Sequence, residues 1–136
     1  MKRLIIRLCV VFLFISLSSV ALAQSQAGSG TDPLPAAVPV LDTVTMVDLG
    51  AHACIPCKMM APIITELGQE YADRAAILFI DVWQHPGQRE KFGIKSIPTQ
   101  IFFDHTGKEI YRHVGFYPKK NIVRVLDRLL KTQDGK

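Results

Sequence analysis

Residues 47–62 read V-D-L-G-A-H-A-C-I-P-C-K-M-M-A-P, and the rest of the chain is organised around them. An apolar, strand-like run brings Cys54 and Cys57 to the start of a predicted helix. A Cys-x-x-Cys pair either binds a metal or cycles between a dithiol and a disulfide, and the surrounding sequence distinguishes the two uses. Here the context favours redox chemistry.

The two cysteines occupy unequal positions in the predicted helix. Cys54 falls at or just before its N-terminus, where unpaired backbone N–H groups and the positive end of the helix dipole stabilise a thiolate. Cys57 follows one turn later and deeper, which suits a thiol that attacks a mixed disulfide. Pro56 fits a first helical turn, because its missing N–H costs nothing there. We therefore expect Cys54 to be the nucleophile and Cys57 the resolving cysteine.

A second stretch, F-G-I-K-S-I-P-T at residues 92–99, makes a family resemblance specific. The first stretch resembles the active-site segment of thioredoxins. The second resembles that family's other landmark, a cis-proline that precedes a strand and faces the cysteines, and it places this proline at Pro98. The likeness runs from about Thr43 to Leu130. It implies a thioredoxin-like fold and thiol-disulfide exchange through a redox-active disulfide, with no other cofactor and no metal.

The resemblance also implies which residues face a substrate. They are the residues between the cysteines and those at the cis-proline, here Ile55, Pro56, Ile97 and Pro98. Thioredoxins usually have tryptophan before the first cysteine and glycine after it, whereas this chain has Ala53 and Ile55. Because the dipeptide between the cysteines tunes redox poise in the family, the direction of electron flow stays open at this point.

Asp48 lies between apolar Val47 and Leu49, so its carboxyl is expected to be buried behind the cysteine pair. Thioredoxins carry an aspartate at the matching position, where it accepts or relays the proton of the deeper cysteine, and many have a lysine beside it. Here Phe79 takes the place of that lysine. Without a cation, desolvation acts unopposed and should keep Asp48 neutral near pH 7 by raising its pKa. A satisfied polar group of the core is the alternative interpretation.

Residues 1–23 have the pattern of a secretory signal peptide. A basic start is followed by an apolar run and by the small residues Ala21 and Ala23, so cleavage is expected to leave a mature chain that begins at Gln24. The alternative is an uncleaved membrane anchor. The apolar run is shorter than the roughly 20 residues that a spanning helix needs, which favours cleavage.

Removing this segment changes the composition. The whole chain has a net charge of +4, but three of its sixteen basic residues and none of its twelve acidic ones lie in residues 1–23, which leaves thirteen against twelve, or +1. The basicity is therefore a targeting feature, and we expect no nucleic-acid partner. Cys9 is lost as well. An exported chain with one C-x-x-C pair is not a disulfide-stapled scaffold.

Composition and periodicity predict the remaining organisation. Residues 24–40 are rich in small and polar side chains and should form a flexible linker, followed by one domain at 41–132 and a tail at 133–136. Thioredoxins usually carry a strand and a helix where this linker lies, so that unit should be absent or reduced. The expected fold class is α/β, a mixed central sheet with helices on both faces. The predicted strands are Thr43 to Leu49, Ala75 to Val82, Thr99 to Phe103 and Glu109 to Val114, and the predicted helices run from the cysteines to Tyr71, from His85 to Phe92 and from Pro118 to Leu130.

Metal binding is the alternative use of the cysteines. A structural zinc site needs four ligands, and the sequence has no second cysteine pair. Ligand types that suit Cu(I) do occur close together in the sequence: His52, Cys54, Cys57, Met59 and Met60. Methionine on a helix is nevertheless a common core residue. His52 either holds the thiolate when protonated or is a solvated loop residue.

The sequence therefore predicts an exported, periplasmic protein-disulfide reductase that is a monomer. Its substrates would be disulfides of extracytoplasmic proteins. By analogy with exported relatives, we expect a membrane electron-transfer protein as its reductant and apocytochrome c among its targets. A disulfide-forming oxidase and a copper-binding chaperone are the alternatives.

Overall fold

The computed structural model describes residues 33–134. The predicted signal peptide, the cleavage site before Gln24 and most of the predicted linker lie outside these residues, as do the last two residues of the predicted tail. Within the described part, no helix is both long enough and apolar enough to cross a membrane.

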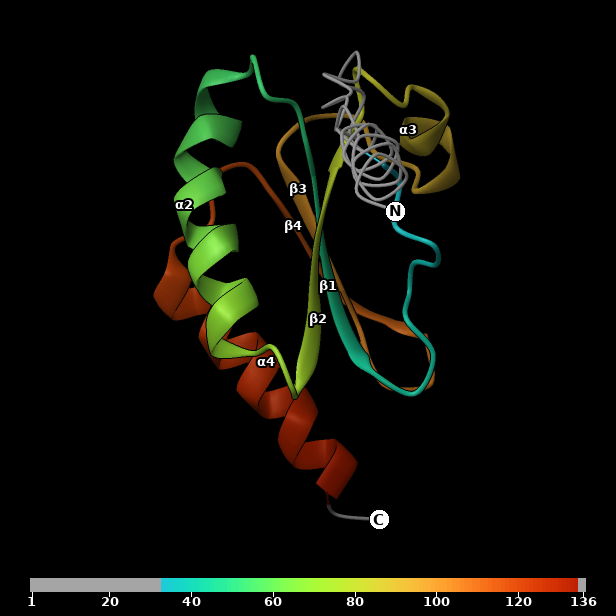
Figure 1. Cartoon of the computed structure of the whole chain (residues 1–136), viewed down its shortest axis with the longest axis vertical. Coiled ribbons are helices and arrows are strands. Elements are labelled where there is room, and N and C mark those ends of the chain that lie inside the picture. Colours follow the sequence, from blue (N-terminus) through green and yellow to red (C-terminus); the bar gives the residue numbers. More distant parts are fainter. Residues whose placement is uncertain (1–32, 135–136) are drawn as a thin grey trace, which may run out of the picture. The chain divides into compact units, whose positions relative to one another are not determined.

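Four strands and three helices follow one another along the described chain (Figure 1). Each predicted strand and helix is present. The last helix continues beyond Leu130, where it was predicted to end. No glycine or proline interrupts it before residue 135, and the positive charge of Lys131 in its last turn interacts favourably with the negative end of the helix dipole. The elements are β1 (Val44–Gly50), α2 (Ile55–Glu70), β2 (Ala75–Asp81), α3 (Gly87–Lys91), β3 (Thr99–Phe103), β4 (Glu109–Val114) and α4 (Lys119–Asp134).

The strands form one sheet in the order β2-β1-β3-β4. β2 runs parallel to β1, whereas β3 pairs antiparallel with both β1 and β4. β1 is central in this sheet, and all seven of its residues are buried. The predicted α/β class with a mixed central sheet is thus confirmed. Residues 33–43, which precede β1, contain no helix or strand.

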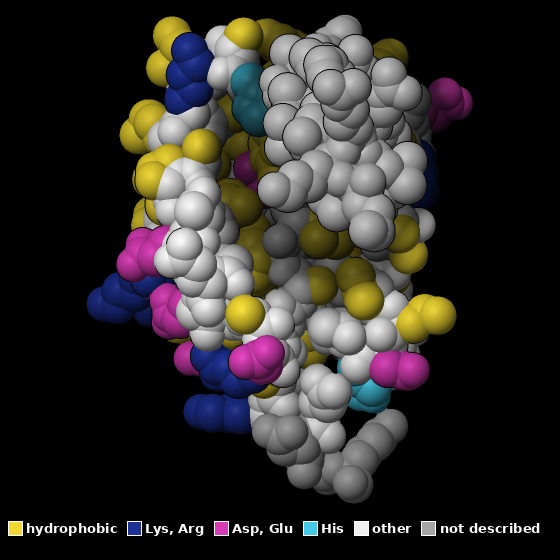
Figure 2. Space-filling model, viewed as in Figure 1, with side chains coloured by type: hydrophobic (Ala, Val, Ile, Leu, Met, Phe, Trp, Pro, Cys, Tyr) yellow, Lys and Arg dark blue, Asp and Glu magenta, His cyan; other side chains and the backbone are white. Residues whose placement is uncertain are grey.

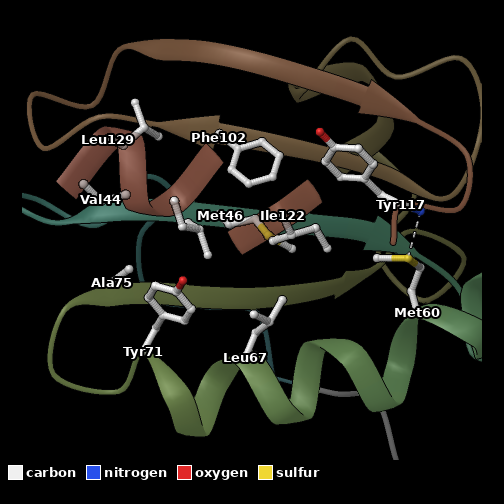
Figure 3. Packing of buried hydrophobic residues seen from close by; sticks show 11 residues of the cluster. Val44, Met46, Met60, Leu67, Tyr71, Ala75, Phe102, Tyr117, Ile122 and Leu129 are labelled. Atoms are coloured by element: carbon white, nitrogen blue, oxygen red, sulfur yellow. Dashed lines mark hydrogen bonds between the residues drawn. The ribbon is translucent and has the colours of Figure 1, made fainter. Parts of the chain in front are cut away.

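One face of the sheet is covered by α2 and α4. Met46 of β1 and Phe102 of β3 are opposite each other in the sheet, so their side chains lie on the same face, and both belong to a buried cluster with residues of α2 and α4. Met60 of α2 and Ile122 of α4 belong to the same buried cluster, in which Met60 lies beside Tyr117 (Figure 3). The Sδ atom of Met60 also accepts the backbone N–H of Tyr117 at 3.3 Å, which ties α2 to the segment before α4.

The other face carries a second apolar cluster. Val47 of β1 and Ile101 of β3 belong to it, together with Ile94 from the segment after α3. In Figure 1, α3 lies on the opposite side of the sheet from α2 and α4, so helices cover both faces as predicted. Val38 packs against this second cluster. This contact comes from the segment that the sequence predicts to be a linker, and the domain bounds of 41–132 stay a prediction.

Candidate active site

The cysteine pair lies where β1 ends and α2 begins. Cys54 is the N-cap residue of α2 and has extended backbone angles, and its Sγ accepts the N–H of Cys57 at 3.4 Å. Pro56 occupies the first turn of the helix, where a missing N–H leaves no hydrogen bond unmade. The sequence thus places a sulfur at the positive end of the helix, which favours a thiolate.

The two cysteines are joined by a disulfide. Cys54 is half-buried, whereas Cys57 is only 3% exposed. A partner protein can therefore approach the sulfur of Cys54 more easily than that of Cys57. This difference in access agrees with the predicted division of roles between the two residues.

Gly50 lets the disulfide pack directly onto the sheet. A Cβ atom at this position would lie 3.3 Å from both Cβ and Sγ of Cys57, and 3.1 Å from Cε2 of Phe79. Cys57 therefore sits over the end of β1, next to Phe79 of β2. Sequence analysis did not single out Gly50, although a glycine that ends a buried strand beside a reactive motif is a signal of close approach.

Pro98 lies at the same end of the sheet. The peptide bond between Ile97 and Pro98 is cis. Leu49 pairs with Thr99 across β1 and β3, so Pro98 is level with Gly50, over which Cys57 packs. The carbonyl of Pro98 accepts the N–H of Gly115 at 2.8 Å. The two sequence landmarks therefore meet at one edge of the molecule, as the resemblance implied.

Asp48 is buried on the face of β1 that α2 covers, and it is 1% exposed. Gly50, which contacts Cys57, lies two residues further along the same face, roughly 6.6 Å away. Asp48 therefore lies behind the cysteine pair, as expected. Burial raises its pKa to about 6, against an ordinary value of 3.8.

The expectation that desolvation of Asp48 acts unopposed was wrong. The side-chain amide of Gln100 donates a hydrogen bond of 2.7 Å to Oδ1 of Asp48, and this bond favours the carboxylate and lowers its pKa. With a pKa of about 6, Asp48 is mostly ionised at pH 7, not neutral. Sequence analysis missed Gln100. The available signal was a polar amide in the strand T-Q-I-F-F, whose other side chains are apolar or small.

Asp81 holds the loop before the cysteines in place. Its Oδ2 accepts the N–H of His52 at 2.9 Å, and its Oδ1 accepts the N–H groups of Trp83 and Gln84 at 2.8 and 3.1 Å. Burial favours the neutral acid, but these donors and His52 outweigh it and lower the pKa of Asp81. The sequence located Asp81 only as the strand aspartate that sets Phe79 at the position of the missing lysine, and it indicated no role for it, because a carboxyl at a strand end is not by itself distinctive.

His52 lines a small, mostly apolar cavity together with Cys57. Its ring is tilted against Phe79, with the ring centres 5.1 Å apart, and its Nε2 is 3.9 Å from Oδ2 of Asp81. The cavity has a volume of about 210 Å³, and Cys57 and Ile64 are among its lining residues. The side chain of His52 is 58% exposed, so it is a solvated residue that lies against Asp81 and Phe79.

Exposed apolar side chains surround the cysteine pair. Ile55 is 77% exposed and Met59 53%, both in the first turns of α2. In Figure 2, hydrophobic side chains gather at the end of the molecule where α2 begins. Two further apolar side chains are exposed. Phe116 follows Gly115, whose N–H binds the carbonyl of Pro98, and the backbone N–H of Trp83 binds Asp81. This arrangement offers an apolar surface to a polypeptide that approaches Cys54.

Residues 33–134 contain no cluster of three or more His, Cys, Asp or Glu side chains suited to a metal ion. Of the ligand types that suggested Cu(I), the sulfur of Met60 is buried and already accepts the N–H of Tyr117. Met60 is thus a core residue, in line with the alternative considered for it.

Comparisons with known proteins agree on one family. The thioredoxin family model matches residues 36–128. Thioredoxin from Staphylococcus haemolyticus is 45% identical over 87 residues, which cover 64% of this chain and 83% of the relative. Thioredoxin from Staphylococcus aureus is 44% identical over the same coverage.

Solved structures are similar over a comparable part of the chain. Thioredoxin NaTrxh from Nicotiana alata superposes with a TM-score of 0.58 and 31% identity, and the match covers 65% of this chain and 75% of that one. The germline-specific thioredoxin Deadhead from Drosophila melanogaster has the same TM-score at 25% identity, with 65% and 82% covered.

Proposed function

Because this chain belongs to the thioredoxin family, we propose that it reduces disulfides in proteins outside the cytoplasm. Thioredoxins are protein-disulfide oxidoreductases that act through a redox-active disulfide without a cofactor, and this chain has that pair as Cys54 and Cys57. It is an enzyme of this kind. One observation supports Cys54 as the cysteine that attacks the substrate: Cys54 caps α2 and is accessible, whereas Cys57 is buried.

The reaction proceeds in two exchanges. The Cys54 thiolate attacks one sulfur of a substrate disulfide, a mixed disulfide forms, and the other substrate sulfur leaves as a thiolate. Cys57 then loses its proton and attacks the sulfur of Cys54, which releases the second substrate sulfur. Two electrons pass from the cysteine pair to the substrate, and the protein is left with the Cys54–Cys57 disulfide. Pro98, Ile97, Ile55 and Pro56 form the surface that receives the substrate chain.

The signal-like pattern of residues 1–23 supports export to the periplasm. In an oxidising compartment a reductase has to be reduced again after each turnover, so the proposal includes a membrane electron-transfer protein as its reductant. Apocytochrome c thiols that await haem attachment are a suitable target, by analogy with exported relatives alone.

A disulfide-forming oxidase would use the same two exchanges in reverse. Ile55 stands where thioredoxins have glycine, and the residues between the cysteines influence the reduction potential, so the direction is settled by measurement. The test is a redox titration of the purified protein against glutathione. A potential more reducing than that of the glutathione couple supports the reductase. A strongly oxidising potential would assign the protein to disulfide formation.

Substrates can be captured with a Cys57→Ser variant, which stops the reaction at the mixed disulfide. Expression of this variant in the native host, followed by purification without reductant, should yield disulfide-linked complexes of periplasmic proteins. A Cys54→Ser, Cys57→Ser double variant is the matched control and should capture nothing. Complexes with cytoplasmic proteins alone would contradict the proposed compartment.

A further inference from the structure

Asp48 and Gln100 form a polar pair inside an otherwise apolar face of the sheet. They are directly opposite each other in the antiparallel pairing of β1 and β3, so their side chains lie side by side. Nε2 of Gln100 donates to Oδ1 of Asp48 at 2.7 Å, and the two residues are 0% and 1% exposed. Neither Oδ2 of Asp48 nor Oε1 of Gln100 has a hydrogen-bond partner in the described part of the chain.

Among residues 33–134, the side chains that flank this pair in the sheet make no hydrogen bond to its two unpaired oxygens. Across from Asp48 on β2 is Phe79, and the next pair on the same face, Met46 and Phe102, is apolar. Across from Gln100 on β4 is His113, whose ring stacks on Tyr117 at 4.0 Å and whose Nε2 lies 3.2 Å from the carbonyl oxygen of Phe116.

Titratable groups lie on or next to the elements that adjoin this pair. Cys57 and Lys58 of α2 line the cavity together with Phe79. The others are Asp81 at the end of β2, His113 of β4 and Tyr117 before α4. None of them is among the causes that set the pKa of Asp48, which are burial and the bond from Gln100.

A buried glutamine with an unpaired oxygen is an expensive way to fill space. An apolar side chain of the same size would remove the unpaired Oε1, but it would leave Oδ1 of Asp48 without its donor, and strand β3 is otherwise apolar on this face. The amide of Gln100 lies directly beside Asp48, the carboxyl placed above behind Cys57. This placement points to the chemistry of the cysteine pair.

We propose that Gln100 is a positioning residue for the resolution step, in which its amide anchors Oδ1 of Asp48 and leaves Oδ2 free to accept the proton of Cys57. The proposal rests on the proposed role of Cys57 as resolving cysteine. The proton moves from the thiol of Cys57 to Oδ2 of Asp48, and the resulting thiolate attacks the sulfur of Cys54. The substrate sulfur leaves and takes a proton from water. Gln100 supplies the donor that a neighbouring cation would otherwise provide, because a hydrogen bond to a carboxylate stabilises its ionised form.

The direct test is an NMR titration of the Asp48 carboxyl carbon in the oxidised protein, in which the cysteines do not titrate. The wild-type midpoint is expected at about pH 6. Gln100→Met keeps the length of the side chain and removes the donor, so the midpoint should rise by about one to two pH units. Met46→Leu, on the same face of β1 and without a polar contact, is the control and should leave the midpoint unchanged.

An unchanged or lower midpoint in Gln100→Met would overturn the proposal. If that variant does not fold, Gln100→Glu serves instead. It keeps the shape but places a second carboxyl beside Asp48, so it should raise the midpoint further and couple the two titrations.

Kinetics tests the functional half of the proposal. In Gln100→Met, resolution of a preformed mixed disulfide at pH 7 should slow by about two- to tenfold and recover at higher pH, because less of Asp48 is ionised. The rate of the first attack by Cys54 should not change. In an Asp48→Asn background, Gln100→Met should have no further effect on the rate of resolution. A shifted titration with unchanged resolution would keep the contact and reject its role in catalysis. Failure of the protein to reduce any disulfide would instead reject the proposed function.

Discussion

Asp48 makes stability depend on pH in an unusual direction. Its pKa is about 6 in the folded protein, and the ordinary value is 3.8. A raised pKa means that the folded state binds the proton more tightly, so the contribution of this group to stability falls as pH rises from about 4 to 6, and the loss then stays constant at higher pH. The gap between the two values corresponds to about 3 kcal/mol at neutral pH.

Asp48→Asn should therefore raise the free energy of unfolding by about 3 kcal/mol at pH 7.5 and change it little at pH 3.5, where the carboxyl is neutral in the folded chain and mostly neutral in the unfolded chain. Denaturant unfolding of the oxidised protein at the two pH values measures this. An equal gain at both values would mean that asparagine simply packs better, with no buried charge involved.

Cys54 and Cys57 should differ in reactivity once the disulfide is reduced. Cys54 is more exposed than Cys57 and lies at the N-terminus of α2, where a thiolate is stabilised. Iodoacetamide at pH 7 should therefore modify Cys54 at least about tenfold faster than Cys57. Mass spectrometry of peptides from a time course gives the two rates. The denatured protein is the control, since both thiols should then react alike. Faster modification of Cys57 would reverse the assigned roles.

Sequence could propose the reacting side chains but not their hydrogen bonds. Cys54 and Cys57 follow from the Cys-x-x-Cys motif, whereas Pro98 follows from the resemblance of residues 92–99 to thioredoxins. Asp48 was located from its apolar neighbours. Gln100 is 52 positions away in the chain, and only the register of β1 with β3 brings it beside Asp48. Contacts of this kind depend on strand pairing, which local patterns do not contain.

Among the secondary-structure elements, β1 and α2 pack too closely at Gly50 to accommodate a larger side chain there. Gly50→Ala places a methyl group 3.1 Å from the ring of Phe79 and 3.3 Å from the Sγ of Cys57. We expect it to destabilise the oxidised protein by about 1–3 kcal/mol, because the helix start has to move away from the sheet. Thermal or denaturant unfolding measures the loss.

Gly68→Ala is the matched control for this substitution. Gly68 lies inside α2, and a Cβ atom there meets nothing within 4 Å. This change should stabilise the protein by about 0.5–1 kcal/mol, since alanine loses less entropy than glycine in a helix. If both alanines had the same effect, crowding at Gly50 would not be the cause.

The elements themselves were largely predictable because their signals are local. The hairpin strands at 99–103 and 109–114 have the predicted ends, since a turn with Gly107 separates two runs of strand-forming residues. The end of α4 was placed too early, because its last residues are polar and carry no apolar periodicity. Val38 also packs against the second apolar cluster, which its place as one apolar residue in a segment of small ones did not indicate.

For the whole molecule, the compartment decides what the cysteine pair can do. We predict that export removes residues 1–23, so the protein recovered from the periplasm should begin at Gln24. Intact-mass spectrometry of that fraction is the measurement. Ala23→Phe replaces a small residue of the cleavage site and should leave the segment attached. A wild-type protein that keeps residues 1–23 in the membrane fraction would show an anchored form instead.

Met59 and Met60 are adjacent in sequence but differ in their exposure to oxidants. Met59 is 53% exposed beside the cysteines, whereas Met60 is fully buried with its sulfur against the N–H of Tyr117. Peroxide that enters the same compartment should therefore convert Met59 to its sulfoxide long before Met60. That change would make part of the apolar surface around Cys54 polar and leave the core intact, so oxidative damage would weaken substrate docking while the fold survives.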